Sequence, residues 1–142
     1  MSAAVAVQPR STRDVTRPLA VAGALAATLA IWLIAHPLAG VDLAVHSVAG
    51  DAVAHVGPAS VALAVLLAGL AACGLLSAIE RFARRPRTTW SVIAYTTLAL
   101  SLAGPIALGE TNGAIATLTS MHLAAAGILI PALGRSSQRR VR

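Results

Sequence analysis

The chain has 142 residues, of which 57% are hydrophobic and 11% are charged, and its mean hydropathy is +0.78. This composition leaves too little polar surface to cover a soluble globule, and it indicates an integral membrane protein. The formal charge is +6, but aromatic residues make up only 3% of the chain, so a platform for stacking nucleic-acid bases is missing. We therefore expect no nucleic-acid partner. Cys73 is the single cysteine, which excludes an internal disulfide and a CxxC motif.

The N-terminal part of the chain predicts a tail followed by a membrane span. Residues 1–17 mix small, polar and charged side chains without helical periodicity, which indicates a flexible cytoplasmic tail. An uncharged apolar run covers residues 19–35, and it is just long enough to cross a hydrocarbon core of ~30 Å. Pro18 suits the first turn of a helix. The run is long for a signal peptide and no clear cleavage site follows it, so we predict an uncleaved first transmembrane helix.

The segment after this helix, residues 36–57, is longer than a plain helical connection. Apolar residues alternate with others from Val41 to His46, and a second short apolar stretch runs from Ala52 to Val56 after Gly50 and Asp51. This pattern predicts a small β-hairpin in the first extracytoplasmic loop, with an irregular loop as the alternative.

The same loop holds side chains that could bind a metal ion, namely His36, His46, His55, Asp42 and Asp51. Imidazole and carboxylate groups suit zinc or copper, but the spacings match no compact ligand motif. We expect solvated loop residues here, with a metal site or a pH sensor as the alternative. No residue is assigned to a metal.

Three further apolar runs of about 20 residues predict transmembrane helices over residues 58–79, 90–109 and 114–133. Pro131 falls in the final turn of the last one. Only residues 110–113 separate the last two runs, so these helices must be antiparallel neighbours. The transmembrane domain is thus expected to cover residues 18–134, with a basic cytoplasmic tail over residues 135–142.

The positions of the arginines predict the orientation of the bundle. All 11 basic residues are arginines, and the apolar runs separate them into three clusters. The clusters are Arg10, Arg13 and Arg17; Arg81, Arg84, Arg85 and Arg87; and Arg135, Arg139, Arg140 and Arg142. Because cytoplasmic flanks retain positive charge, we predict an all-α membrane protein, a four-transmembrane-helix bundle in the inner (plasma) membrane with both termini in the cytoplasm. The clusters are also expected to contact anionic lipid headgroups.

Several side chains near the membrane boundaries suggest local contacts. Glu80 stands four residues before Arg84, the favourable order for an ion pair on a helix surface. Trp90 near the inner boundary and Trp32 near the outer one are typical of interfacial anchors. Gly69 belongs to a set of small residues spaced four apart, which predicts close packing between helices.

His122 lies about halfway along the fourth predicted span, where an ionisable group is costly and needs a partner. Counting 1.5 Å per residue from the membrane faces places it at nearly the depth of Ser101 in the third span. Pro105 frees the carbonyl of Ser101 from its helical hydrogen bond. We predict that a neutral His122 donates to this carbonyl or to the Ser101 hydroxyl, and that Gly104 permits the close approach.

The same residues allow functional alternatives: a proton relay, a metal or haem ligand, or a Ser/His hydrolase dyad. A hydrolase also needs an orienting acid, and bis-His haem ligation needs a second histidine within the spans; the predicted spans contain neither. We therefore assign no catalytic, cofactor-binding or metal-binding residue. The intramembrane polar cluster of Ser101, Gly104, Pro105 and His122 is expected to tie the third span to the fourth.

Short motifs occur in order along residues 19–133. They are Gly40 to Leu43, Leu76 to Phe82, Ser101 to Pro105, Met121 to Leu123, and Ile130 with Pro131. With these motifs the chain resembles a family of small four-helix bacterial membrane proteins, catalogued as a domain of unknown function, number six thousand and sixty-nine. The resemblance implies the four-helix architecture, and it brings no assigned activity, substrate or cofactor.

Two classes of function remain. The first is a non-enzymatic structural, regulatory or accessory bundle, either as a homo-oligomer or with another membrane protein. The second is a subunit of a small transporter or channel in which His122 lines a polar path. The first is favoured because the predicted spans carry no acidic residue to couple protons or bind cations. No cofactor is expected in either case.

Overall fold

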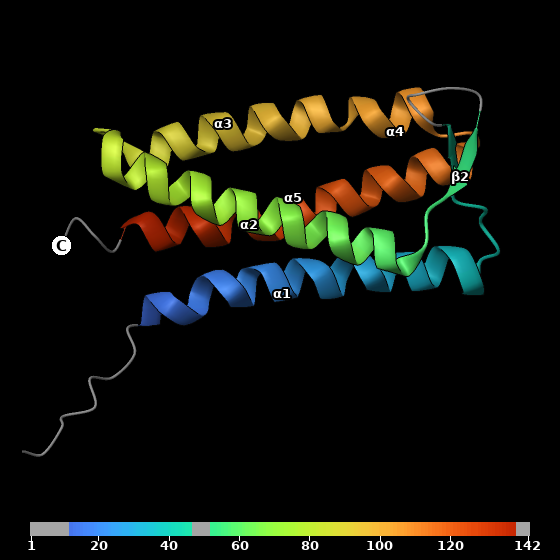
Figure 1. Ribbon diagram of the computed structural model, residues 1–142, viewed down its shortest axis with the longest axis horizontal. Helices are drawn as coiled ribbons and strands as arrows, with labels where there is room; N and C mark the ends of the chain where they lie inside the picture. Colours follow the sequence, from blue (N-terminus) through green and yellow to red (C-terminus); the bar gives the residue numbers. More distant parts are fainter. Residues whose placement is uncertain (1–11, 47–51, 139–142) are drawn as a thin grey trace, which may run out of the picture.

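The computed structural model describes residues 12–46 and 52–138, and it is mostly helical with a small two-stranded sheet (Figure 1). In chain order the elements are α1 (Thr12–Leu33), the π-helix η1 (Ile34–Leu38), β1 (Ala44–His46), β2 (Val53–His55), α2 (Pro58–Phe82), α3 (Pro86–Ser101), α4 (Ala103–Leu108) and α5 (Asn112–Gln138). Within the described ranges, four helical stretches are long and apolar enough to cross a membrane. They are Val15–Leu38, Pro58–Phe82, Pro86–Leu108 and Asn112–Ser136, which confirms the four predicted spans at the level of length and composition.

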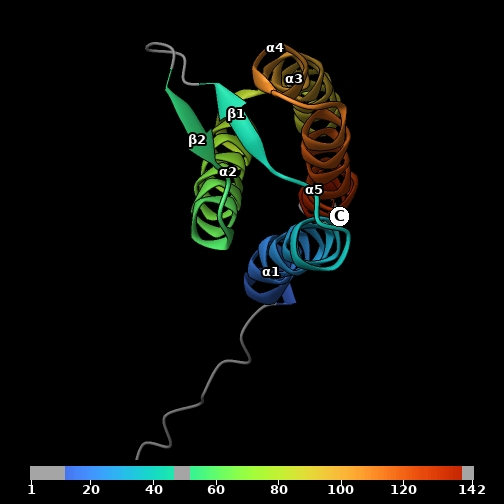
Figure 2. The same ribbon diagram turned by 90° about the vertical axis from the view of Figure 1, so that its right-hand side faces the viewer.

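The helices run side by side along the long axis of the molecule (Figure 1). Seen from the end, α1, α5 and α3 with α4 form a curved row, and α2 packs across its open side (Figure 2). The two strands lie across one end of the bundle, which we call the hairpin end. Thr12 and Gln138 lie at the opposite end, together with the turn between α2 and α3, and we call it the arginine end.

The helices extend beyond the predicted spans at the arginine end. α1 begins at Thr12 rather than at residue 19, so Pro18 lies inside the helix instead of in its first turn. α2 continues to Phe82, and α5 continues to Gln138, well past Pro131. The length of an apolar run reflects the thickness of a hydrocarbon core, whereas arginine and other good helix formers allow the helix to continue beyond that run. Residues 1–11 and 139–142 of the predicted tails lie outside the described residues.

At the hairpin end, proline changes the geometry of α1. Pro37 has no N–H to donate to the carbonyl four residues earlier, and the hydrogen-bond ladder shifts to π spacing. The N–H of Ala39 accordingly donates to the oxygen of Ile34, five residues back, at 2.9 Å. Gly40, with φ of 68°, then turns the chain away from the helix, a conformation that favours glycine.

The predicted β-hairpin is confirmed. β1 and β2 are antiparallel, and Val45 pairs with Ala54 at the centre of the register. β1 also contacts the turn between α4 and α5, because Val45 forms a bridge with Gly109, and the N–H of Glu110 donates to the oxygen of Ala44 at 3.2 Å. The sheet is thereby fixed to the helices below it. The predicted turn at Gly50 and Asp51 lies outside the described residues.

Packing between α1 and α2 depends on Gly69. A Cβ atom placed on Gly69 would lie 2.8 Å from both Cγ atoms of Val21, so only glycine fits against this part of α1. The close packing predicted at Gly69 is therefore confirmed. Large apolar side chains on the outside of the helices, such as Leu63, Leu70 and Leu100, are exposed. Such a surface is unusual for a protein in water and suits a hydrocarbon environment.

Candidate functional site

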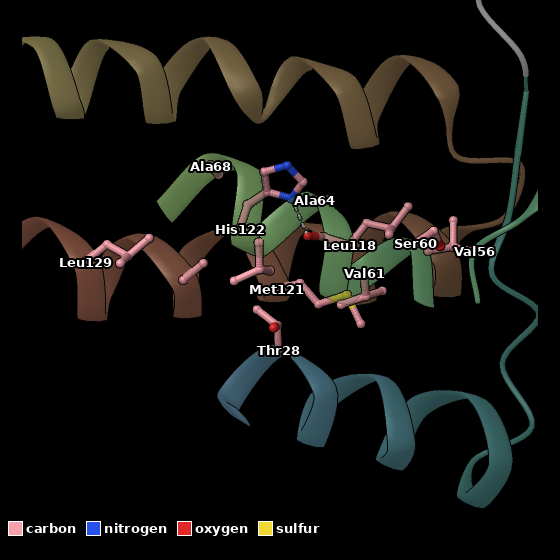
Figure 3. A pocket seen from close by; sticks show the side chains of 12 residues that line it. Thr28, Val56, Ser60, Val61, Ala64, Ala68, Leu118, Met121, His122 and Leu129 are labelled. Carbon is pink, nitrogen blue, oxygen red and sulfur yellow. Dashed lines mark hydrogen bonds between the residues drawn. The ribbon is translucent and has the colours of Figure 1, made fainter. Parts of the chain in front are cut away.

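His122 lies in the middle of α5 and is half-buried. Its Nδ1 atom lies 2.8 Å from the carbonyl oxygen of Leu118, one turn earlier in the same helix (Figure 3). Because a carbonyl oxygen can only accept a hydrogen bond, Nδ1 carries the hydrogen in this contact. In the neutral imidazole, Nε2 is then an acceptor without a hydrogen.

The hydrogen bond predicted between His122 and Ser101 is not formed among the described residues. The Oγ atom of Ser101 donates instead to the carbonyl oxygen of Leu98, at 2.8 Å, and His122 bonds to Leu118. Both side chains thus form their hydrogen bond with a carbonyl oxygen of their own helix. The carbonyls one turn back are always within reach, whereas a bond between helices needs a precise approach of two backbones.

The break in the third span is confirmed, but Gly104 does not have its predicted role. α3 ends at Ser101 and α4 begins at Ala103, and Pro105 is buried where it cannot donate to the carbonyl of Ser101. A Cβ atom on Gly104 would meet no atom within 4 Å, so no helix approaches it closely. The tight position is Gly109, where a Cβ atom would lie 2.7 Å from the backbone oxygen of Pro105 and 2.5 Å from Cγ1 of Ile115.

His122 lines a cavity of about 340 Å³ between α1, α2 and α5 (Figure 3). Small side chains explain this space: Ala64 and Ala68 of α2 and Ala125 of α5 line it, and they are too short to fill the gap between the two helices. Gly69 draws α2 toward α1, while these alanines leave α2 and α5 apart. The cavity was not predicted from the sequence, although alanines spaced four apart on α2 were a signal for it.

Two further polar side chains line the cavity, and each gives its hydrogen to the backbone. Thr28 is 1% exposed, and its Oγ1 atom donates to the oxygens of Ala24 and Leu25, at 2.9 and 3.0 Å. The Oγ atom of Ser60 donates to the oxygen of Gly57 at 2.7 Å. Like His122, both therefore bond to their own stretch of chain. Ser60 is exposed, so its oxygen can still accept a hydrogen bond, whereas Thr28 is buried.

An ion pair links α1 to α2 near the arginine end. Nη2 of Arg17 lies 2.8 Å from Oε1 of Glu80, whose side chain is only 6% exposed, and Nη1 of Arg17 donates to Oγ of Ser77 at 2.8 Å. Oε1 of Glu80 thus pairs with Arg17 and not, as predicted, with Arg84. α2 ends at Phe82 and the chain is extended at the next residue, so Arg84 is not one helical turn beyond Glu80.

The two tryptophans bond to the backbone of other segments. Trp90 is 3% exposed, and its Nε1 atom donates to the oxygen of Ile130 in α5 at 3.1 Å. Its predicted role as an anchor at the membrane surface is therefore wrong, because the indole is enclosed between α3 and α5. Trp32 donates to the oxygen of Val56 at 2.8 Å and ties the end of α1 to the chain that leaves β2.

His36 and His55 at the hairpin end have different partners. Nδ1 of His36 lies 2.9 Å from the oxygen of Val41, and the His36 ring lies 5.2 Å from that of Trp32. His55 is exposed, and its Nε2 atom lies 3.5 Å from Oδ1 of Asp42. Within residues 12–46 and 52–138, no group of three His, Cys, Asp or Glu side chains could hold a metal ion. Asp51 lies outside these ranges.

Comparison with known proteins places the chain in a family. No curated protein and no solved structure matches it. A family model matches residues 8–139, nearly the whole chain, and that family is described as a family of unknown function. The match agrees with the resemblance that the short motifs indicate, from Gly40 after the first span to Pro131 in the last. The chain belongs to the DUF6069 family of unknown function.

Proposed function

We propose that this chain is an integral protein of the inner (plasma) membrane that crosses the bilayer four times, with both termini in the cytoplasm. In this proposal it acts as a non-enzymatic structural, regulatory or accessory bundle. The observation that carries the proposal is the separation of charge between the two ends of the four helices. The arginine end would face the cytoplasm, and the hairpin end would face the opposite side.

The described arginines all belong to one end of the bundle. Arg17 lies near the start of α1, Arg81 and Arg87 flank the turn between α2 and α3, and Arg135 lies near the end of α5. Asp42 and Glu110, by contrast, lie next to the hairpin. Positive charge is retained on the cytoplasmic side of membrane proteins, which supports the proposed orientation. Arginines at this boundary can also bind anionic headgroups, and lipid is the partner that we propose for them.

The middle of the bundle supports a hydrocarbon environment. Exposed side chains between the two ends include Leu67 and Leu70 of α2, Val92 and Tyr95 of α3, and Leu123 of α5. α1, α2 and α5 run through this region as continuous helices, which pair backbone N–H and C=O groups within one segment, as hydrocarbon requires. In this proposal, packing and contacts within each helix account for the polar side chains in this region. His122, Ser101 and Thr28 each bond to a carbonyl of their own helix.

A fusion experiment tests the orientation and the membrane location together. Green fluorescent protein and alkaline phosphatase are fused in turn after residue 142, because the first is fluorescent only in the cytoplasm and the second is active only outside it. We expect a fluorescent first fusion, an inactive second fusion, and retention of both in the membrane after an alkaline carbonate wash. Release by the wash would contradict the membrane location, and active phosphatase would contradict the orientation.

A second candidate function is a subunit of a small transporter or channel. One observation favours it: His122 lines a cavity within the bundle. The cavity wall is otherwise mostly alanine, valine and leucine, and its lining has no acidic side chain. A path for ions needs charged or carbonyl groups along its length, so we place this function second.

A further inference from the structure

The polar side chains that line the cavity share one property: each has already donated its hydrogen. Thr28 donates to Ala24 and Leu25, Ser60 donates to Gly57, and Nδ1 of His122 donates to Leu118. What remains for an occupant is the Nε2 lone pair of a neutral His122 and the oxygen lone pairs of the exposed Ser60, whereas the buried Thr28 is out of reach. Among the side chains that line the cavity, the polar groups therefore act as hydrogen-bond acceptors.

His122 is the strongest of these acceptors. Its Nε2 atom has no hydrogen-bond partner in the described part of the chain, while Nδ1 is fixed by a 2.8 Å contact that also sets the tautomer. An imidazole in an apolar wall gains from a hydrogen-bond donor, because water is scarce at this depth. The rest of the wall, which includes Val61, Ala64, Ala125 and Leu129, offers only apolar contact.

The cavity is open on one side, where Ser60, Ala64 and Ala68 of α2 are exposed, so its size limits only the part of a ligand that lies between the helices. Its volume of about 340 Å³ lies at the lower end of the range for small-molecule sites. This is room for one ring with a short chain, or for the hydroxyl-bearing end of a longer compound. A compound whose only polar group is a carbonyl or an ether could not bond to His122, because both partners would be acceptors.

We propose that the cavity binds an apolar alcohol or phenol whose O–H group donates to Nε2 of His122, with its hydrocarbon body against Ala64, Ala68 and Ala125. The proposal rests on the proposed function, because a four-helix bundle in the bilayer meets such compounds dissolved in the hydrocarbon. It extends that function by naming a ligand class and a site. The discriminating feature is the donated hydrogen.

The test uses compounds that share one shape and differ in the donor. The purified full chain in lipid nanodiscs is titrated with 4-butylphenol, and separately with butylbenzene and 4-butylanisole, which bracket the phenol in size but have no hydrogen to donate. Binding of every compound is followed by the methyl resonances of Ala68 and Ala125, which line the cavity in the unaltered chain and in the variants. In the chains that retain His122, the ¹⁵N resonance of its Nε2 atom shows in addition whether the nitrogen accepts a hydrogen bond. We expect the phenol to bind roughly tenfold more tightly than either control, as one hydrogen bond in an apolar site allows.

Three variants assign the effect to the site. His122→Leu removes the acceptor and should abolish the preference for the phenol while leaving binding of butylbenzene. Ala64→Leu fills part of the cavity while His122 is retained, and it should weaken all three compounds by tenfold or more. Ser120→Ala is the matched control, because Ser120 lies on α5 outside this cavity and bonds to its own helix at Ala116. It should behave as the unaltered chain does.

The outcomes separate the ligand proposal from the proposed function. Equal binding of 4-butylphenol, butylbenzene and 4-butylanisole would overturn recognition of the hydroxyl. The cavity would then be a space that takes any hydrocarbon, such as a lipid chain. Binding that survives Ala64→Leu, or no binding by any compound, would overturn the cavity as the site. None of these results bears on the wash or on the fusions, which test the membrane location and the orientation independently.

Discussion

Glu80 shows how a single polar residue is accommodated at the edge of the apolar region. Its carboxylate is almost fully buried, and Arg17 reaches it from the neighbouring helix with one guanidinium nitrogen while the other contacts Ser77. A buried carboxylate without a cation is costly, since the desolvation of the charge is then not offset. The pair therefore fixes how α1 lies against α2 near the arginine end.

Replacing Arg17 tests this pair. We expect Arg17→Leu to lower the free energy of unfolding in mixed micelles by about 2 kcal/mol, because the buried Glu80 carboxylate loses its contact with the Arg17 guanidinium. The double variant Arg17→Leu with Glu80→Leu should recover part of the loss, since no buried charge remains. Equal stability of the single variant and the unaltered chain, measured by denaturation with sodium dodecyl sulfate, would show that the contact contributes nothing.

At the same scale, the partners of His122 and Ser101 show what the sequence could and could not predict. The spacing of residues predicted the depth of both side chains and the break at Pro105. It could not predict that each side chain bonds within its own helix. A bond between α3 and α5 depends on how the two helices are rotated against each other, and this rotation depends on contacts between distant residues, such as that of Trp90 with Ile130. The ion pair of Arg17 with Glu80 was missed for the same reason, since it joins two helices.

At the scale of elements, the hairpin depends on the turn between α4 and α5. Leu43 and Ala44 are buried at the base of the strands, Val45 forms a bridge with Gly109, and Glu110 donates to Ala44. Gly109 is in an ordinary extended conformation, with φ of −69° and ψ of 126°, so the space around it and not its backbone angle requires glycine. The alternation of apolar residues predicted the strands, but nothing local in the sequence indicated the neighbour of β1.

Gly109 and Gly104 form a matched pair for a test of this contact. Gly109→Ala should lower the unfolding midpoint in detergent, because its Cβ atom would meet the backbone oxygen of Pro105 at 2.7 Å, and a loss of about 1–3 kcal/mol is typical of such overpacking. Gly104→Ala should be neutral or slightly stabilising, since its Cβ atom meets nothing within 4 Å and alanine favours the helix. Similar losses for both variants would contradict the tight turn.

At the scale of the whole molecule, the four spans and the hairpin follow from patterns that the sequence states directly: apolar runs of spanning length, and alternation between them. The exact ends of α1, α2 and α5 do not follow from these patterns, because helices continue past the apolar run wherever the flanking residues permit. The cavity beside His122 also had to come from the structure, since it depends on how far α2 stands from α5. Both ends of the described chain lie at the arginine end, as an even number of helical passes along the bundle requires.

The central claim is that the bundle crosses the membrane with its arginine end in the cytoplasm, and labelling of single cysteines in intact cells tests it most directly. Cys73 is replaced by serine, and Ala54→Cys in β2 is compared with Thr88→Cys near the start of α3, both exposed positions. A maleimide that cannot cross the membrane should label residue 54 in intact cells, and residue 88 only after the cells are opened. Labelling of residue 88 but not 54 in intact cells would contradict the orientation, and labelling of neither, even in opened cells that retain the folded protein, would contradict the exposure of the two ends.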